Sequence, residues 1–249
     1  MEQQEQTQGY VFQKEVEIRF YDCDTTRRSR ISTLMRYIAD IAGIDYTNRG
    51  YDYQWLYDRG MVFLLSRVSI RIHNMPAADD RLMINTWEHG KKGALFYRDF
   101  EIRRPDGELM ASAATAWLLV DPASHKVLRP SAFTGKMQCY PEKIPDCFPA
   151  EKVKLPEGMD YAGDRRVVYS DLDANGHINN ANYGNIAMDV LPEEVQTRRM
   201  TDFLINYNHE AKQGDNIALY ISQEGNECFV EGQSDGHSCF SCRITFAEE

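Results

Sequence analysis

Residues 95–120 read LFYRDFEIRRPDGELMASAATAWLLV, two strand-like runs on either side of a proline, an aspartate and a glycine. The runs cover Leu95 to Arg103 and Leu109 to Val120. The Asp106-Gly107 step between them favours a tight turn, because glycine reaches the positive φ angles that short hairpin turns need. The stretch therefore predicts an antiparallel hairpin, and two further strand-like runs precede it, Val62 to Ile72 and Arg81 to Glu88.

A helical pattern lies upstream of these strands. Its apolar residues recur every three or four positions and so share one face. Further upstream, the alternating run from Val16 to Phe20 predicts another strand. One buried helix followed by four antiparallel strands is an α+β pattern, since parallel strands would need a helix between them. The apolar face of the helix consists of Ile31, Leu34, Met35, Ile38, Ile41 and Ala42.

The same order of elements occurs a second time along the chain. Arg165 to Tyr169 predicts a strand, Asn180 to Val190 predicts a short helix, and four more strand-like runs reach Phe246. The two copies align at an offset of 149 positions, which places Asp24 against Asp173. A duplicated helix-wrapped sheet is the simplest account, and fusing the two subunits of a dimer would produce it.

Proline content marks the boundary between the two copies. Residues 130–156 hold five prolines and little periodicity, which is the composition of a linker. We therefore predict a disordered tail at residues 1–9, an N-terminal half at 10–130, a linker at 131–160 and a C-terminal half at 161–249.

Composition excludes several classes of function. The net charge of −10 argues against nucleic acid as the main partner, and no apolar run is long enough to span a membrane. The polar N-terminus does not resemble a signal peptide. The six cysteines are scattered, and the pair at Cys239 and Cys242 has no second pair to complete a zinc site. A cytoplasmic protein with reduced thiols and no metal or organic cofactor is expected.

The densest group of hydrogen-bonding side chains is Asp173-Ala174-Asn175-Gly176-His177-Ile178-Asn179-Asn180, at a strand-to-helix junction. In an extended backbone, positions 173, 175 and 177 would point to one side. A carboxylate, an amide and an imidazole can together orient water and stabilise an oxyanion, and a helix N-terminus would add N–H donors. Asn and Asp also form turns and helix caps, so the pattern alone leaves a structural role open.

The first copy lacks this set of side chains. Thr26 stands where the second copy has Asn175, and Arg28 stands where it has His177. An active site is therefore expected in the second copy only.

The segment around Asp173 resembles the active-site segment of the acyl-acyl-carrier-protein thioesterases of plants and bacteria. The resemblance implies a double hotdog fold, two halves that each wrap an antiparallel sheet around a long helix. It also implies cleavage of fatty-acyl groups from the phosphopantetheine arm of acyl carrier protein, giving free fatty acid and holo-carrier protein. The resemblance extends over Val16 to Tyr21, Thr86-Trp87, Arg98 to Phe100, Ala116-Trp117 and Ile205 to Ala211.

Carried over by position, the functional residues that the resemblance implies are Asp173, Asn175, His177 and Glu210. The N-terminal half would supply the substrate pocket and the C-terminal half the catalytic groups. Many family members have a cysteine directly after the glutamate, but this chain has Ala211. A thiol nucleophile is therefore excluded at that position, which leaves attack by water. Either Glu210 or Asp173 would be the base, and the sequence leaves that choice open.

Several alternatives remain at this stage. An acyl-CoA thioesterase or a 3-hydroxyacyl dehydratase would share the fold, and a non-catalytic binder of acylated carrier protein would share the pocket. Both a monomer and a homodimer are compatible with a duplicated fold. Gly232-Gln233-Ser234-Asp235-Gly236 matches a serine-hydrolase motif, but that motif needs a following helix. Strand-like residues follow here, so we predict a hairpin turn.

Overall fold

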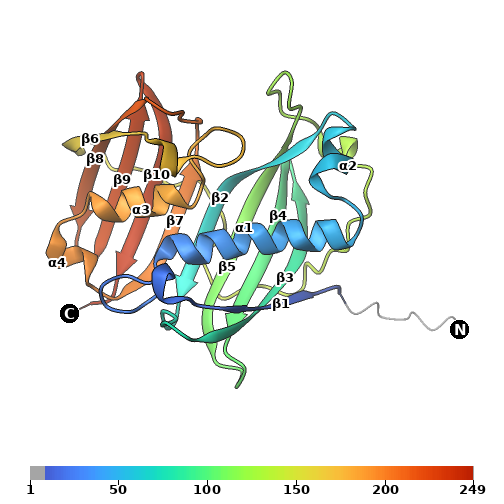
Figure 1. Cartoon of the computed structure of the whole chain (residues 1–249), viewed down its shortest axis with the longest axis horizontal. Coiled ribbons are helices and arrows are strands. Elements are labelled where there is room, and N and C mark those ends of the chain that lie inside the picture. The colour runs from blue at the N-terminus through green and yellow to red at the C-terminus, as the bar shows by residue number, and fades with distance from the viewer. Residues whose placement is uncertain (1–8, 249) are drawn as a thin grey trace, which may run out of the picture.

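The ten strands that the structure describes join one antiparallel sheet (Figure 1). The structure is a computed structural model that describes residues 9–248, so the predicted tail lies, apart from Gly9, outside the described residues. The strand order is β1-β3-β4-β5-β2-β7-β10-β9-β8-β6. The N-terminal strands are β1 (Phe12–Glu17), β2 (Val62–Ile72), β3 (Arg81–Lys92), β4 (Leu95–Arg103) and β5 (Leu109–Val120). The C-terminal strands are β6 (Asp160–Arg166), β7 (Met200–Tyr207), β8 (Asn216–Glu224), β9 (Glu227–Ser234) and β10 (His237–Phe246).

The two halves meet where β2 pairs with β7. Arg67 lies opposite Asn206 and Arg71 opposite Asp202 in this antiparallel pair. The Arg71 Nε also donates to Asp202 Oδ1 at 2.8 Å, which joins the two strands through a side-chain ion pair. Outward from this seam the strand order of one half repeats that of the other, which is the arrangement of a double hotdog fold.

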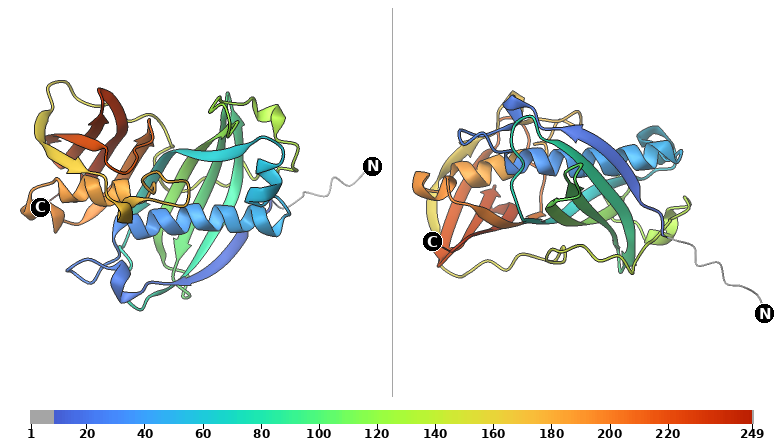
Figure 2. Two further views of the ribbon diagram at one scale, coloured as in Figure 1. Left: turned by 45° about the horizontal axis from the view of Figure 1, so that its top comes forward. Right: turned by 90° about the horizontal axis from the view of Figure 1, so that it is seen from below.

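The helices lie together on one side of the sheet (Figures 1 and 2). They are α1 (Ile31–Asn48), α2 (Tyr53–Tyr57), α3 (Asn182–Asp189) and α4 (Glu193–Gln196). The predicted apolar face of α1 is confirmed, because all six of its residues are buried. Gly184 lets α3 approach α1 closely: a Cβ at this position would lie 2.8 Å from Met35 Sδ. A single helix layer therefore spans both halves.

The predicted linker runs along the opposite face of the sheet (Figure 2). Trp87 Nε1 donates to the Lys143 carbonyl at 2.9 Å, and the Val153 N–H donates to Asn206 Oδ1 at 2.6 Å. Lys143 Nζ also pairs with Glu101 at 2.8 Å. These bonds attach the segment to strands of both halves, so it serves as a cover as well as a connection.

Two predicted strands end earlier than expected. The run predicted as a strand from Val16 to Phe20 is part of β1, which stops at Glu17, and the strand predicted to reach Tyr169 stops at Arg166. In both places an aspartate side chain accepts a backbone N–H three residues upstream, Arg19 to Asp22 and Val168 to Asp171. This bond closes a short 3-10 turn, which removes the following residues from the sheet.

Candidate functional site

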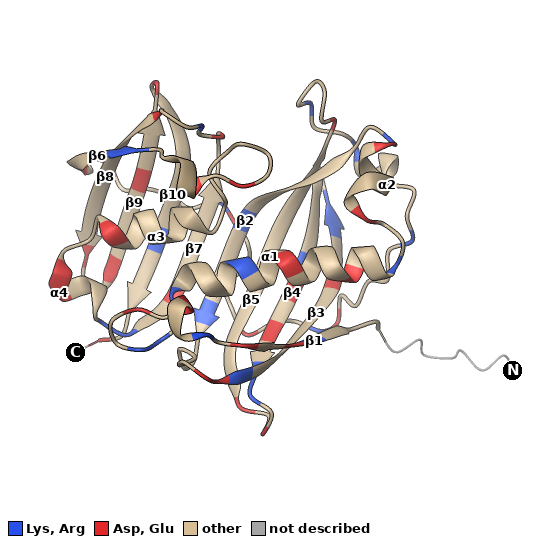
Figure 3. Cartoon of the chain, in the orientation of Figure 1, with Lys and Arg blue, Asp and Glu red and all other residues tan. Residues whose placement is uncertain are grey.

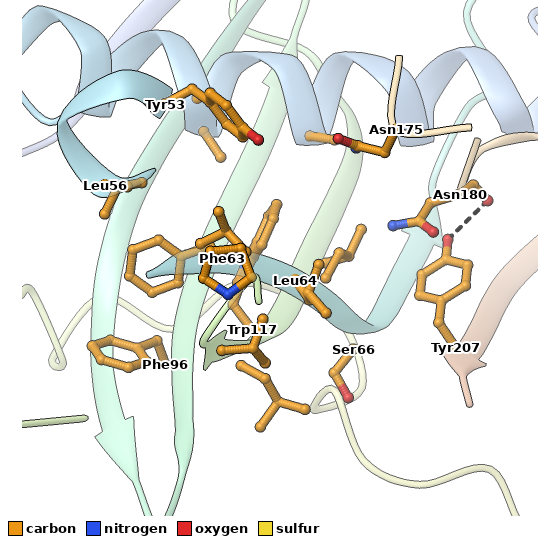
Figure 4. A pocket seen from close by; sticks show the side chains of 18 of the residues that line it. Tyr53, Leu56, Phe63, Leu64, Ser66, Phe96, Trp117, Asn175, Asn180 and Tyr207 are labelled. Atoms are coloured by element: carbon orange, nitrogen blue, oxygen red, sulfur yellow. Dashed lines mark hydrogen bonds between the residues drawn. The ribbon is translucent and has the colours of Figure 1, made fainter. Parts of the chain in front are cut away.

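A cavity of about 710 Å³ lies beneath α1, and both halves line it (Figure 4). The C-terminal half contributes the loop before α3, the start of α3 and the end of β7, while the N-terminal half contributes α1, α2, β2, β3, β4 and β5. The size falls within the range of small-molecule sites, roughly 300–1,000 Å³. All four side chains predicted from the resemblance line it, namely Asp173, Asn175, His177 and Glu210.

The loop that carries three of these residues is a tight turn. The Asp173 N–H donates to the His177 carbonyl at 2.9 Å, and Gly176 adopts a φ of +79°. The Asp173 carboxylate accepts the Asn175 N–H at 2.8 Å, which is an Asx turn. The backbone is therefore not extended here, so the condition under which positions 173, 175 and 177 would point to one side is not met. The aspartate bonds its own loop, and glycine permits the reversal.

Backbone pairing brings His177 to Glu210. His177 forms an antiparallel bridge with Lys212, and the Ile178 N–H donates to the Ala211 carbonyl at 2.9 Å. The loop is thereby fixed alongside the chain that leaves β7. As a result His177 Nε2 lies 3.2 Å from Glu210 Oε2. The imidazole is 21% exposed and the carboxylate 41%, so the pair borders the cavity and is open to water.

The other two predicted side chains occupy different parts of the same rim. Asn175 projects toward the cavity from the tip of the loop (Figure 4). Among residues 9–248, no hydrogen bond joins the Asp173 carboxylate to the His177 ring; that carboxylate is bonded to Asn175 N instead. The structure thus pairs the imidazole with Glu210 and gives Asp173 a place within the turn.

The predicted contribution of a helix N-terminus is not supported. Helix α3 begins at Asn182, five residues after His177. Two N–H groups at its start already have acceptors: the Asn182 N–H donates to the Asn179 carbonyl at 2.8 Å and the Gly184 N–H to the Ala181 carbonyl at 3.0 Å. The Ala181 N–H, just before the helix, donates to the Asn179 side chain at 3.0 Å. The Asn179 side chain therefore bonds the turn before the helix, whose N-cap residue is Ala181.

Two tyrosines of the site were not predicted. The Tyr207 hydroxyl donates to the Asn180 carbonyl at 3.1 Å (Figure 4). The Tyr183 hydroxyl is buried in the cavity wall and forms no hydrogen bond with the described residues, although the Ala211 backbone lies near it. Burial raises the pKa of Tyr183 above its usual range, so this phenol remains a proton donor at neutral pH. Tyr183 lies in the first turn of a predicted helix, and nothing in the sequence indicated that its hydroxyl would face the cavity.

Aromatic side chains line the part of the cavity within the N-terminal half (Figure 4). Phe63 contacts Phe96 edge-on at a ring separation of 5.1 Å and Tyr46 at 5.5 Å. Such a surface suits a hydrocarbon chain, because burial of apolar area drives its transfer from water. The apolar lining residues here include Leu56, Leu64, Leu65, Trp117 and Leu118.

A buried ion network borders this aromatic end. Arg98 Nη2 donates to Asp45 Oδ2 at 2.5 Å, while Arg49 Nη1 lies 3.2 Å from Glu88 Oε2. The Tyr46 hydroxyl donates to Glu88 at 2.8 Å. Arg98, Glu88 and Tyr46 all line the cavity. The methyl end of an acyl chain gains no favourable contact from charged groups that are already paired. This network therefore marks the polar limit of the apolar part of the cavity.

Two further expectations concern side chains near the site. Ala211 is fully buried beside Glu210, and the cysteine expected at this position in many relatives is absent. The serine-hydrolase motif lies in the β9–β10 hairpin, where Asp235 and Gly236 have φ angles of +50° and +76°. The predicted turn is confirmed.

Within residues 9–248, no group of three or more His, Cys, Asp or Glu has an arrangement that could hold a metal, and no helix is both long and apolar enough to span a bilayer.

Comparison with known proteins places the chain in a family. Its residues 9–131 match the acyl-ACP thioesterase N-terminal domain and residues 159–248 match the C-terminal domain. A palmitoyl-acyl carrier protein thioesterase of Cuphea hookeriana is 24% identical over 219 residues, which are 81% of this chain and 52% of the relative. An oleoyl-acyl carrier protein thioesterase of Arabidopsis thaliana is 22% identical over 88% of this chain and 65% of its own length. The chain therefore spans about half the length of the first relative.

Solved structures show the same fold. An acyl-ACP thioesterase from Bacteroides thetaiotaomicron superposes with a TM-score of 0.87 at 21% identity, over 95% of this chain and 98% of that one. The 12:0-ACP thioesterase from Umbellularia californica gives 0.78 at 17% identity, over 96% and 98%. The sequence matches together cover more than half of the chain, and so the protein belongs to the acyl-ACP thioesterase family.

Proposed function

We propose that this protein hydrolyses fatty acyl-acyl-carrier-protein thioesters to free fatty acid and holo-carrier protein. The observation that carries the proposal is the contact of 3.2 Å between His177 Nε2 and Glu210 Oε2, at the rim of a cavity whose inner part is aromatic and aliphatic. The polar pair suits the thioester and the apolar part suits the acyl chain. Family membership points in the same direction.

The proposed reaction begins with water held at the His177–Glu210 pair. Glu210 accepts a proton from this water as its oxygen attacks the thioester carbonyl carbon. The Asn175 amide donates to the oxyanion that forms. The intermediate then collapses, the C–S bond breaks, and the proton passes through His177 to the leaving thiolate. The products are a fatty acid and the free thiol of the phosphopantetheine arm.

The structure favours Glu210 over Asp173 as the base. Glu210 is the carboxylate in contact with the imidazole, whereas Asp173 accepts a backbone N–H of its own turn. We assign Asp173 a positioning role, holding Asn175 and His177 on one loop. No metal or organic cofactor is required by this mechanism, because a thioester is already an activated acyl group.

The partner and the location are part of the proposal. The substrate is a fatty acyl group on the phosphopantetheine arm of acyl carrier protein. Reduced, unpaired cysteines are usual in the cytoplasm, and the six cysteines of this chain are free thiols. We therefore place the reaction in the cytoplasm.

Thiol release from acyl-carrier-protein and acyl-CoA series tests the function. The wild type is compared with His177→Ala and Glu210→Gln, and with Glu224→Gln as a control. Glu224 is an exposed carboxylate at the end of β8 that does not line the cavity. We expect release from the carrier-protein series in the wild type and in Glu224→Gln. We expect a loss of about 100-fold or more in the two site variants, the size of a general acid–base contribution.

Three results would contradict the proposal. No release from either series would support a non-catalytic binder of acylated carrier protein. Equal or faster release from acyl-CoA would support an acyl-CoA thioesterase. Full activity in both His177→Ala and Glu210→Gln would place the chemistry elsewhere.

A further inference from the structure

A second cavity, of about 720 Å³, lies between the loop that precedes α1 and the segment from α3 to the start of β7. In Figure 3 both segments carry blue basic positions near the end of α1 that faces the C-terminal half. None of the described side chains that line this cavity is aromatic. Its apolar residues are Ile31, Met75, Met188 and Met200.

Internal symmetry makes this cavity the counterpart of the candidate active site. Arg28 bridges to Ala77 as His177 bridges to Lys212. The Ser29 N–H donates to the Pro76 carbonyl at 2.7 Å, as the Ile178 N–H does to the Ala211 carbonyl at 2.9 Å. The two loops are therefore held in the same way in both halves.

The same correspondence shows what has replaced each functional side chain. Asp24 occupies the position of Asp173, and its carboxylate likewise accepts a backbone N–H two residues on, from Thr26 at 2.7 Å. Arg28 occupies the position of His177, and Met75 that of Glu210. A carboxylate–imidazole pair is thus replaced by a thioether and a guanidinium. Hydrolysis by the proposed mechanism is impossible in this cavity.

The charge of the two cavities is opposite. One arginine and four carboxylate residues line the candidate active site. Four arginines and two aspartates line the second cavity, in a chain whose net charge is −10. A local excess of positive charge on an acidic protein favours an anionic ligand. The lining arginines are Arg28, Arg30, Arg198 and Arg199.

Two of these arginines are available to a ligand. Arg30 Nη1 donates to the Tyr21 carbonyl at 2.8 Å and Arg198 Nη2 to the Ala247 carbonyl at 3.1 Å, so both are held by the protein. Arg28 and Arg199 are exposed, and neither forms a side-chain hydrogen bond or ion pair with another residue of 9–248. Guanidinium groups bind phosphate through paired N–H donors.

We propose that the second cavity binds the phosphate of a phosphopantetheine arm through Arg28 and Arg199, without hydrolysing it. The choice of this phosphate ester rests on the proposed function, because that function makes the phosphopantetheine arm a ligand of this fold. Arg28 stands where His177 stands in the active site, so the arm would bind here with its phosphate at the loop, whereas in the active site its thioester would lie there. The short α3 and the absence of an aromatic end among the described lining residues leave no counterpart of the acyl region. The site therefore fits the arm itself, borne by a carrier protein or by CoA.

Calorimetric titration with pantetheine 4′-phosphate tests the assignment. We compare wild type with Arg28→Gln, Arg199→Gln and the double variant, at low and high salt. Arg27→Gln is the matched control, since Arg27 is an exposed neighbour that does not line the cavity. We expect the double variant to raise the Kd at least about tenfold, the order expected when charged hydrogen bonds are lost. High salt should weaken wild-type binding, while Arg27→Gln should bind as the wild type does.

Further ligands identify the source and separate this inference from the proposed function. Titration with CoA and with holo-carrier protein shows which bearer of the arm binds through the two arginines. Equal binding of pantetheine without phosphate, or an unchanged Kd in the double variant, would overturn the assignment. Arginine-dependent binding in a protein that releases no thiol would uphold this site and refute the hydrolysis. Hydrolysis in a protein that shows no arginine-dependent binding would support the proposed function and refute this second site.

Discussion

Tyr183 combines burial, a position in the cavity wall and a hydroxyl without a partner among the described residues. A buried hydroxyl that lacks a partner in the free protein can donate to an oxyanion at small cost in reorganisation. We expect Tyr183→Phe to lower kcat about 10-fold to 100-fold, the effect of one hydrogen bond to a charged group. It should leave the melting temperature unchanged or higher. Steady-state kinetics on one acyl-carrier-protein substrate checks this, and unaltered kcat would assign the hydroxyl to packing alone.

The role of Asp173 can be separated from that of Glu210 by two substitutions at one position. Asparagine can still accept the Asn175 N–H, so Asp173→Asn preserves the turn, whereas Asp173→Ala removes the acceptor. We expect the asparagine variant to keep kcat/KM within about threefold and the alanine variant to lose about tenfold, as loss of one hydrogen bond predicts. A much larger loss in Asp173→Asn than in Glu210→Gln would make Asp173 the base.

At the scale of elements, the aromatic end of the cavity is built where β2 and β4 pass beneath α1. Phe63 lies among Tyr46, Phe96 and Phe133 there, and it borders the cavity. Phe63→Leu removes ring volume from this end, so we expect the preferred acyl chain to lengthen. Phe246→Leu is the control, because Phe246 is fully buried in the C-terminal half and does not line the cavity. Hydrolysis rates across a series of acyl chain lengths, measured in both variants, test this. An unchanged chain-length profile in Phe63→Leu would show that another part of the cavity limits the acyl chain.

The elements that the sequence predicted well are those whose burial repeats along the chain. The four long N-terminal strands and α1 follow directly from apolar periodicity, and β2, β4 and β5 have the predicted bounds. β3 runs to Lys92 instead of the predicted Glu88, and α3 covers Asn182–Asp189 instead of Asn180 to Val190. At Phe20, Tyr169 and the 173–177 loop the cause of the error is an aspartate side chain that bonds the backbone and turns the chain. Such bonds depend on conformation rather than on periodicity. Tyr183 was missed for a different reason: only the assembled cavity distinguishes it from a core residue.

The resemblance to the thioesterase family identified the residues of the candidate site, which hydrophobic periodicity could not identify. It brought together Asp173, Asn175, His177 and Glu210, which are 37 residues apart at most in sequence and line one cavity in the structure. The pairing of His177 with Glu210 instead of Asp173 came only from the backbone bridge to Lys212. Bridges of this kind join segments that are distant in sequence, and a single sequence does not show which residues pair with each other.

At the scale of the whole molecule, the predicted boundaries near residues 130 and 160 divide a chain whose halves share one sheet. The β2–β7 pair, the close approach of α1 to α3 at Gly184 and the attached segment at Val153 all cross the division. Separating the halves would expose two long strand edges, which are prone to aggregation. The halves should therefore unfold together, even though each repeats the same architecture.

Cooperative unfolding can be measured with residues the chain already has. Its three tryptophans, Trp55, Trp87 and Trp117, all lie in the N-terminal half, while the buried thiols Cys228, Cys239 and Cys242 lie in the C-terminal half. Tryptophan fluorescence and mass-resolved labelling of these thiols thus report on one half each along a single urea titration. We expect coincident midpoints, because unfolding either half removes the strand partner of the other. Midpoints that differ beyond error, with the thiols protected after the tryptophan signal is lost, would show two independent domains joined by a linker.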